Sequence, residues 1–195
     1  LQARGLETPK GILLVGVPGC GKSLSAKMAA KAWSLPLFRF DIGSVYDKWV
    51  GESEKKMREA LRFLDNMAPC VVWIDEIEKG LAISDGGNDT GRRVLGQFLF
   101  WLQESGSRVF LVATANDIGA LPSELFRKGR FSETFFVDLP NRTERRAVMA
   151  QYCTQALHWQ PDEAQMQPAL GLCDDSRSIG TYTLPEHWLV VGAGN

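Results

Sequence analysis

The chain has 195 residues, of which 45% are hydrophobic and 23% are charged, and its formal net charge at pH 7 is -1. A chain of this length and composition can bury the core of one domain with a small appendage. Because the net charge is close to zero and both signs are interspersed, nothing indicates DNA, RNA or an anionic membrane surface as the main partner.

Five apolar, β-rich runs are predicted to form strands covered on both faces, because most of them lack the period-two alternation of a half-exposed strand. The runs are Gly11 to Val17, Leu35 to Asp41, Cys70 to Asp75, Arg108 to Ala115 and Glu133 to Leu139. Helix-like segments lie between them, at Ser23 to Trp33, Glu54 to Met67 and Arg92 to Gln103. This alternation predicts a right-handed α/β fold with a parallel five-stranded sheet.

The pattern changes after Pro140. Asn141 and Thr143 can cap a helix that runs to about Leu157, and a second helix is predicted over 162–170. The predicted organisation is therefore an α/β domain at 1–140, a small helical appendage at 141–170 and an atypical tail at 171–195. The tail shows neither a helical period nor clean alternation, so we expect it to be disordered or poorly packed.

The four cysteines show no C-x-x-C pairing and only two histidines accompany them, so the spacing of a metal site is absent. Small buried thiols in a reducing compartment fit better than disulfides. With no signal peptide and no apolar run near the roughly 20 residues of a membrane span, the predicted location is the cytoplasm or an organelle stroma. Because the chain opens with Leu1 rather than Met, we expect a piece of a longer protein.

The stretch GVPGCGKS at 16–23 fits the pattern G-x-x-x-x-G-K-[ST] between a buried strand and a helix. Its glycines let the backbone form a nest of amide groups around phosphate oxygens, and the helix N-terminus adds a positive dipole. Lys22 is predicted to reach the β and γ phosphates, and Ser23 to provide a hydroxyl ligand for Mg²⁺. The alternative is a Gly-rich turn that matches by chance. The predicted nucleotide-binding residues are Gly16, Val17, Pro18, Gly19, Cys20, Gly21, Lys22, Ser23 and Leu24.

Two carboxylates, Asp75 and Glu76, end the buried strand of VVWIDE, at the edge where ligands bind in open α/β sheets. Asp75 can orient Mg²⁺ or its water, and Glu76 can polarise the attacking water as general base. Asn116 closes the strand of VFLVATAND and can position that water against Glu76. The alternatives are an acidic pair that only caps the next helix and an asparagine that only begins a turn.

Two arginines, Arg127 and Arg130, lie beyond the fourth strand in the polar, glycine-bearing turn of LFRKGRF. An arginine inserted at a γ phosphate can contribute about 10³ to 10⁵ in rate. Surface arginines are common, however, so spacing alone leaves an ordinary surface position as the alternative.

In their order and spacing, GVPGCGKS, WIDEIEK, ATAND and LPSELFRKGRF resemble the AAA+ ATPases over about Lys10 to Leu157. The stretch PKGILLVGVPGCGKSLSAK looks most like the corresponding sequence of the uncharacterised AAA proteins of cyanobacteria and algal plastid genomes. The resemblance implies a three-layer P-loop NTPase fold followed by a partial helical lid, with ATP and Mg²⁺ as ligands, catalysis by Glu76 and a sensor at Asn116. It also implies that Arg127 and Arg130 act on a neighbouring subunit's nucleotide, in a ring that is usually a hexamer.

The segment KWVGESE at 48–54 matches the place where related unfoldases carry an aromatic pore loop, so the resemblance makes Trp49 and Val50 candidate contacts with a protein client. A flat amphipathic ring can grip many polypeptide sequences, because most of its contact is apolar area. The alternative is that Trp49 packs on its own helix. The chain departs from the family in lacking residues ahead of Lys10 that help to form the adenine pocket, and a second sensor in 171–195.

The predicted function is ATP binding and Mg²⁺-dependent ATP hydrolysis, coupled to remodelling of a protein partner. The alternative is an ATP-dependent binding or scaffold module with little hydrolysis. Nucleic-acid remodelling ranks last, because it needs a basic surface that the composition does not indicate. If the chain is plastid-encoded, its predicted location is the plastid stroma.

Overall fold

The computed structural model describes residues 9–45, 52–82, 89–156, 158–160, 162, 166, 178–179 and 182–183. The chain divides into two compact units, Leu1–Val137 and Asp138–Asn195, and each is described by itself. Within these residues, no helix combines the length and the apolar composition that crossing a membrane requires.

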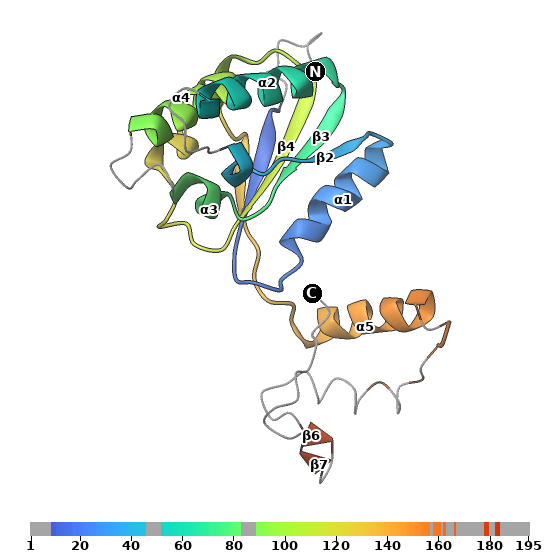
Figure 1. Cartoon of the computed structure of the whole chain (residues 1–195). Helices are drawn as coiled ribbons and strands as arrows, with labels where there is room; N and C mark the ends of the chain where they lie inside the picture. Colours follow the sequence, from blue (N-terminus) through green and yellow to red (C-terminus); the bar gives the residue numbers. More distant parts are fainter. Residues whose placement is uncertain are drawn as a thin grey trace. The chain divides into compact units, whose positions relative to one another are not determined.

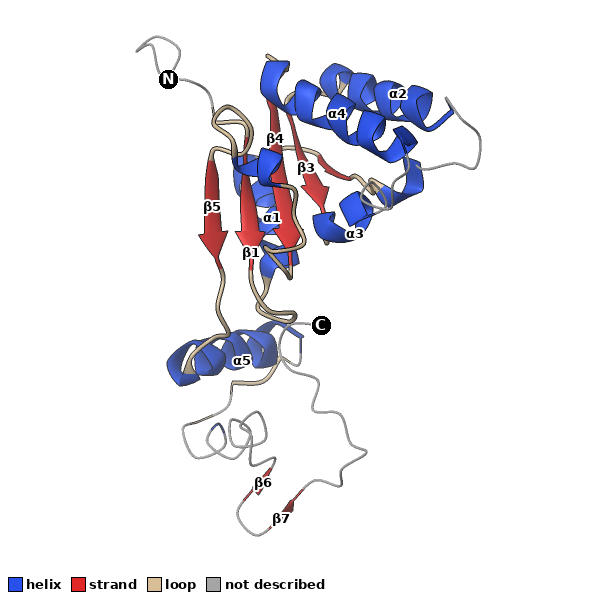
Figure 2. Ribbon diagram, turned by 90° about the vertical axis from the view of Figure 1, so that its left-hand side faces the viewer, coloured by secondary structure: helices blue, strands red, loops and turns tan. Residues whose placement is uncertain are grey.

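The first unit is built on a sheet of five parallel strands in the order β2-β3-β4-β1-β5. The strands are β1 (Gly11–Val15), β2 (Leu37–Arg39), β3 (Cys70–Ile74), β4 (Val109–Ala115) and β5 (Glu133–Phe136). The helices are α1 (Lys22–Trp33), α2 (Glu52–Asn66), α3 (Ile77–Ala82) and α4 (Asp89–Glu104), with 3₁₀ turns η2 (Gly43–Val45) and η3 (Ser123–Phe126). Helix α1 covers one face of the sheet, and α2, α3 and α4 cover the other (Figures 1 and 2). The predicted parallel five-stranded α/β fold is confirmed.

The sheet has a hydrophobic core on each face of its central strands β1, β3 and β4, which are apolar and mostly buried. Strand β5 was also predicted to be covered on both faces, but it lies at the edge of the sheet and all four of its residues are exposed. The larger core lies under α2, α3 and α4, and its fully buried members include Met57, Phe98 and Leu13 of β1. The core under α1 is made of smaller side chains, including Ala26 and Ala30 of the helix. Since these two alanines lie one helical turn apart, α1 can pack closely on the sheet with its N-terminus at the carboxyl end of β1.

Helix α3 was not predicted from the sequence, because its six residues are too few for a helical period. Its place depends on a close approach to the 3₁₀ turn η2. A Cβ added at Gly80 would stand 2.8 Å from Cβ of Ile42, so the absence of a side chain at Gly80 is what lets α3 pack there. Strand β2 is shorter than the predicted run, since Pro36 has no amide hydrogen and Asp41 begins a turn by accepting from the Gly43 N–H at 2.9 Å.

The second unit contains α5 (Arg142–Ala156), which matches the helix predicted after Pro140. Its start is a capping box, in which the Glu144 N–H donates to Oδ1 of Asn141 at 3.0 Å and the Asn141 N–H donates to Oε2 of Glu144 at 2.8 Å. In the tail, β6 (Ser178–Ile179) and β7 (Tyr182–Thr183) pair antiparallel where no element was predicted. Of the second predicted helix, over 162–170, the structure describes only Asp162 and Met166, and the Met166 N–H donates to the carbonyl oxygen of Asp162 at 3.0 Å. Most of the tail falls outside the described residues.

Candidate active site

A tight loop joins β1 to α1 at the carboxyl edge of the sheet. Gly19 and Gly21 have φ angles of +84° and +89°, a left-handed conformation that residues with side chains rarely adopt. Gly16 is required for a different reason, because a Cβ there would stand 2.0 Å from the carbonyl oxygen of Val137. The backbone of the loop therefore requires glycine at these three positions of the motif.

Helix α1 starts at Lys22 directly after this loop and runs for 12 residues. Its N-cap, Gly21, makes no side-chain hydrogen bond to the amide groups of the first turn. The Leu24 N–H donates to the carbonyl oxygen of Gly21 at 3.1 Å. The first amides of an α-helix otherwise lack an acceptor within the helix, and the aligned peptide dipoles favour negative charge in front of them. An uncapped helix start behind a glycine loop is thus a suitable place for a phosphate group.

The Lys22 side chain is folded into the loop and is only 6% exposed. Its ammonium donates to the carbonyl oxygens of Gly16 and Val17, both at 2.6 Å, which offsets the cost of burying the charge. The third N–H donor of an ammonium faces Sγ of Cys20 at 3.6 Å. Because sulfur is a weak acceptor, a phosphate oxygen can displace it and take this donor without disturbing the other two hydrogen bonds.

Ser23 and Asp75 come from α1 and from the end of β3, and their side chains meet. The Ser23 hydroxyl donates to Oδ1 of Asp75 at 2.9 Å, which places two hard oxygen ligands side by side. Over residues 9–45, 52–82 and 89–156, no group of three or more His, Cys, Asp and Glu side chains is placed to hold a metal ion. An Mg²⁺ ion here would take its other ligands from nucleotide phosphates and water, as Mg²⁺ does in many phosphate sites.

Glu76 follows β3 with a φ angle of +48°, a left-handed conformation that costs a side-chain-bearing residue about 1–2 kcal/mol. The backbone is held there by the hydrogen bond from the Glu76 N–H to Oγ1 of Thr114, at 3.0 Å. Both carboxylate oxygens have partners. Oε1 accepts from Nδ2 of Asn116 at 3.0 Å, and Oε2 accepts from the ammonium of Lys79 at 2.6 Å. The structure therefore brings Asn116 to Glu76, as predicted, and adds Lys79.

Thr114 links the two carboxylates and was missed by the sequence analysis. It lies on β4 with 1% of its surface exposed, donates to Oδ1 of Asp75 at 2.7 Å and accepts from the Glu76 N–H. The register that pairs Ile74 with Ala113 places the next residue of each strand side by side. The available signal was a hydroxyl inside a buried apolar strand, where such a group needs a hydrogen-bond partner.

The two predicted arginines lie at and beyond η3. Arg127 is exposed, whereas Arg130 donates a hydrogen bond to the backbone carbonyl of Glu124. In the part of the chain that the structure describes, no hydrogen bond or ion pair joins either arginine to Asp75 or Glu76. The structure thus leaves both arginines outside the network that connects the other candidate residues.

A cavity of about 230 Å³ lies beside the carboxylates at the carboxyl ends of β2 and β3. Asp75, Glu76 and Lys79 line one part of it, and Arg39 and Asp41 line another. No phosphate-loop residue lines the cavity, so it adjoins the carboxylates without enclosing the loop. Since the Glu76 side chain is also 40% exposed, water can reach its carboxylate.

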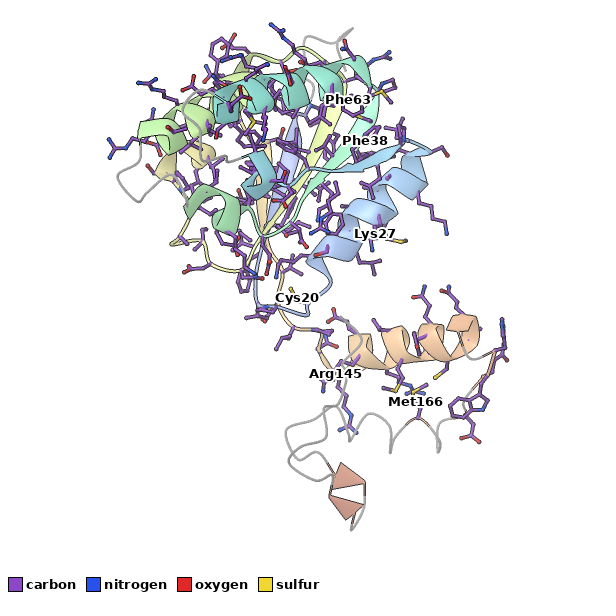
Figure 3. All side chains as sticks on the ribbon, viewed as in Figure 1. Cys20, Lys27, Phe38, Phe63, Arg145 and Met166 are labelled. Carbon is purple, nitrogen blue, oxygen red and sulfur yellow. The ribbon has the colours of Figure 1, made fainter. Side chains whose placement is uncertain are left out.

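Two cysteines allow ligand binding at the loop to be measured. The thiol of Cys20 lies in the loop ahead of α1 and is partly exposed (Figure 3). Cys70 is fully buried in β3, and burial raises the pKa of its thiol, with a further rise from the negative charge of Asp65. Because the thiolate is the reactive form, we expect iodoacetamide to alkylate Cys20 much faster than Cys70.

Saturating ATP with Mg²⁺ is expected to slow Cys20 alkylation about 10-fold or more when ATP is at about ten times its Kd, since mass action leaves few empty loops. Mass spectrometry of the peptides that contain Cys20 and Cys70 measures both rates in one sample. In Lys22→Ala the same ATP concentration should give much less protection. Equal Cys20 alkylation with and without saturating ATP would contradict binding at this loop.

Comparison with known protein families shows which proteins this chain is similar to. Residues 12–139 match the AAA family, described as the ATPase family associated with various cellular activities. The chain belongs to the AAA family of ATPases. This AAA chain is 53% identical over 146 residues to the uncharacterised AAA domain-containing protein ycf46 of Pyropia yezoensis, and 50% identical to that of Guillardia theta. Both matches cover 74% of this chain, and 30% and 29% of those relatives.

A more distant match is the ATP-dependent zinc metalloprotease FtsH of Cyanidium caldarium, which is 38% identical over 152 residues. That match covers 74% of this chain and 25% of the relative. The chain thus spans about 30% of the length of the ycf46 proteins it matches. The resemblance to AAA ATPases that the sequence analysis predicted is confirmed.

The structure unites most of the predicted site. In this AAA chain, residues 16–24 form one loop and the first turn of α1, and their neighbours Asp75, Glu76 and Asn116 share one hydrogen-bonded network. Trp49 and Val50, the predicted client contacts, lie outside the described residues. Their role stays a prediction.

Proposed function

We propose that this AAA chain binds ATP with Mg²⁺ at the phosphate loop and hydrolyses it. The observation that carries the proposal is the convergence of Ser23, Asp75, Thr114, Glu76 and Asn116, which come from α1 and from the ends of β3 and β4. One network therefore connects the start of a phosphate-binding helix with a candidate general base. Such a connection is what phosphoryl transfer needs, because positioning and electrostatics supply most of its catalysis.

Each residue has a role that follows from its chemistry. Lys22 and the N-terminus of α1 bind the phosphates, and Ser23 and Asp75 hold Mg²⁺, which supplies positive charge against the phosphate oxygens when bound. Glu76 accepts a proton from the attacking water as general base. A carboxylate oxygen has two acceptor sites, so each Glu76 oxygen can accept from water beside its present partner. Asn116 keeps the Glu76 carboxylate in one orientation.

We further propose that the protein self-associates into a ring, hexameric in the full-length protein, in which Arg127 and Arg130 act on a neighbouring subunit's nucleotide. This is supported by the exposure of Arg127 and by the place of both arginines outside the network of their own subunit. Hydrolysis would be coupled to remodelling of a protein client through Trp49 and Val50. Similarity to the ycf46 proteins supports the plastid stroma over the cytoplasm as the location.

The alternative is an ATP-dependent binding or scaffold module with little hydrolysis. One observation favours it. The ammonium of Lys79 lies 2.6 Å from Oε2 of Glu76, so one oxygen of the candidate base is already engaged. A protein held in this state would bind ATP and turn it over slowly.

Mixing two inactive variants tests the shared site. Glu76→Gln removes the proposed base but keeps the arginines, whereas the double variant Arg127→Ala/Arg130→Ala keeps the base but loses the arginines. In a ring, the arginines of the first variant complete the site of the second, so the mixture is expected to release phosphate although each variant alone does not. A mixture no more active than the sum of its parts would reject sites shared between subunits.

A further inference from the structure

A third carboxylate, Glu78, lies buried close to the proposed base. It is 8% exposed and comes from α3, two residues after Glu76. Its Oε1 accepts the backbone N–H of Asn116 at 3.0 Å. Its Oε2 is buried, with no hydrogen-bond partner among the residues that the structure describes. Burying a carboxylate with so few partners is unfavourable for stability, so packing alone does not explain an acid at this position.

The position of Glu78 is set by the packing of α3. Ile77 and Leu81, on either side of it in the sequence, are 1% and 2% exposed in the core. The close approach of Gly80 to Ile42 fixes the same helix against η2. Glu78 therefore holds its carboxylate on a helix with little freedom to shift.

Asn116 directly follows the end of β4, and Glu78 accepts a hydrogen bond from its backbone N–H. The last residue of β4, Ala115, is still paired with Val15 of β1. The amide of Asn116 follows that pair, and the Glu78 carboxylate is its acceptor in place of a neighbouring strand. Asn116 thus donates two hydrogen bonds of 3.0 Å, one from its backbone N–H to Glu78 and one from its side-chain amide to Glu76.

We propose that Glu78 is a positioning residue for ATP hydrolysis, which fixes the backbone of Asn116 so that its side-chain amide stays on Oε1 of Glu76. The proposal rests on the function proposed above for this site. Glu78 acts through Asn116 and contacts neither nucleotide nor water in this role. What matters is the acceptor that its side chain offers, and not its negative charge.

Two neutral variants of similar size separate these properties. Glu78→Gln keeps a carbonyl acceptor at the same reach, whereas Glu78→Met fills the space with an apolar side chain that leaves the Asn116 N–H without its acceptor. In the nucleotide-free protein, we expect the backbone amide of Asn116 to exchange with deuterium about 10-fold faster or more in Glu78→Met, and within about 2-fold of wild type in Glu78→Gln. NMR measures this exchange directly, and the amide of Val112 within β4 reports whether the core is intact.

Turnover provides the second measurement. Glu78→Met is expected to lower kcat for ATP by about 10- to 100-fold, the order of loss that a misplaced catalytic group produces, with little change in KM. In an Asn116→Ala background, the same substitution should have no further effect on kcat, because Glu78 acts only through Asn116. A purely structural role predicts effects on kcat that multiply.

The outcomes distinguish this proposal from the one on which it rests. Unchanged Asn116 exchange in a folded Glu78→Met protein overturns the positioning role, and so do effects on kcat that multiply. If Glu78→Met does not fold, Glu78→Asp withdraws the acceptor by one methylene, about 1.5 Å, and slow Asn116 exchange in that variant also overturns it. If wild-type protein does not hydrolyse ATP, the proposed function fails while the exchange measurement still decides whether Glu78 holds Asn116.

Discussion

Glu76→Gln is expected to lower ATP turnover by about 10²- to 10⁴-fold, the usual contribution of a general base, while ATP remains bound. Glutamine has the size of glutamate, and its carbonyl oxygen can still accept from Nδ2 of Asn116, but an amide cannot take a proton from water. The variant loses the ion pair with Lys79, whose side chain is 69% exposed. Because ion pairs between solvent-exposed side chains contribute little to folding, the stability of the protein should change little. Phosphate release and equilibrium ATP binding measure the two effects separately.

A control for Glu76→Gln is Glu104→Gln, which makes the same chemical change at an exposed residue where α4 ends. The control should turn over ATP at the wild-type rate. If Glu76→Gln itself turns over ATP within about threefold of wild type, Glu76 is not the general base, since loss of that base costs about 10²-fold or more.

Lys22→Ala is expected to raise the Kd for ATP by about 10- to 150-fold, because it removes a charge-assisted hydrogen bond of about 1.5–3 kcal/mol to phosphate. The loop also loses the donor that now joins the carbonyl oxygens of Gly16 and Val17. Calorimetric titration with Mg-ATP measures the Kd. Thermal unfolding without nucleotide shows how far the loop itself is destabilised.

The matched control for Lys22→Ala is Lys31→Ala, an exposed lysine in the last turn of the same helix. It removes the same charge from α1 without touching the loop, and its Kd for ATP should equal that of wild type. An unchanged Kd in Lys22→Ala would show that nucleotide, if bound, lies elsewhere.

Features that depend on local sequence were predictable. Buried parallel strands leave continuous apolar runs, and the tight loop after β1 needs glycine at positions that the motif displays, as the φ angles of Gly19 and Gly21 show. The carboxyl ends of parallel strands lie at one edge of the sheet, so Asp75, Glu76 and Asn116 were expected to be neighbours before their distances were known.

Features that depend on strand register and on packing between elements were not predictable. Thr114 contacts Asp75 only because β3 and β4 are paired in the register that places Ile74 beside Ala113. Glu78 reaches Asn116 because α3 packs against η2 through Gly80, a contact between segments far apart in sequence. A single sequence shows the residue types in such contacts but not which of them meet.

The central claim is that the phosphate loop and the carboxylates after β3 form one ATP-hydrolysing site. The most direct test is Mg²⁺-dependent release of phosphate from ATP by the wild-type chain, measured over a range of protein concentrations with Lys22→Ala as the blank. We predict release that requires Mg²⁺, is lost in Lys22→Ala, and rises per subunit with protein concentration. Equal release from Lys22→Ala, or none from a wild-type chain that binds ATP at every concentration, would contradict the claim.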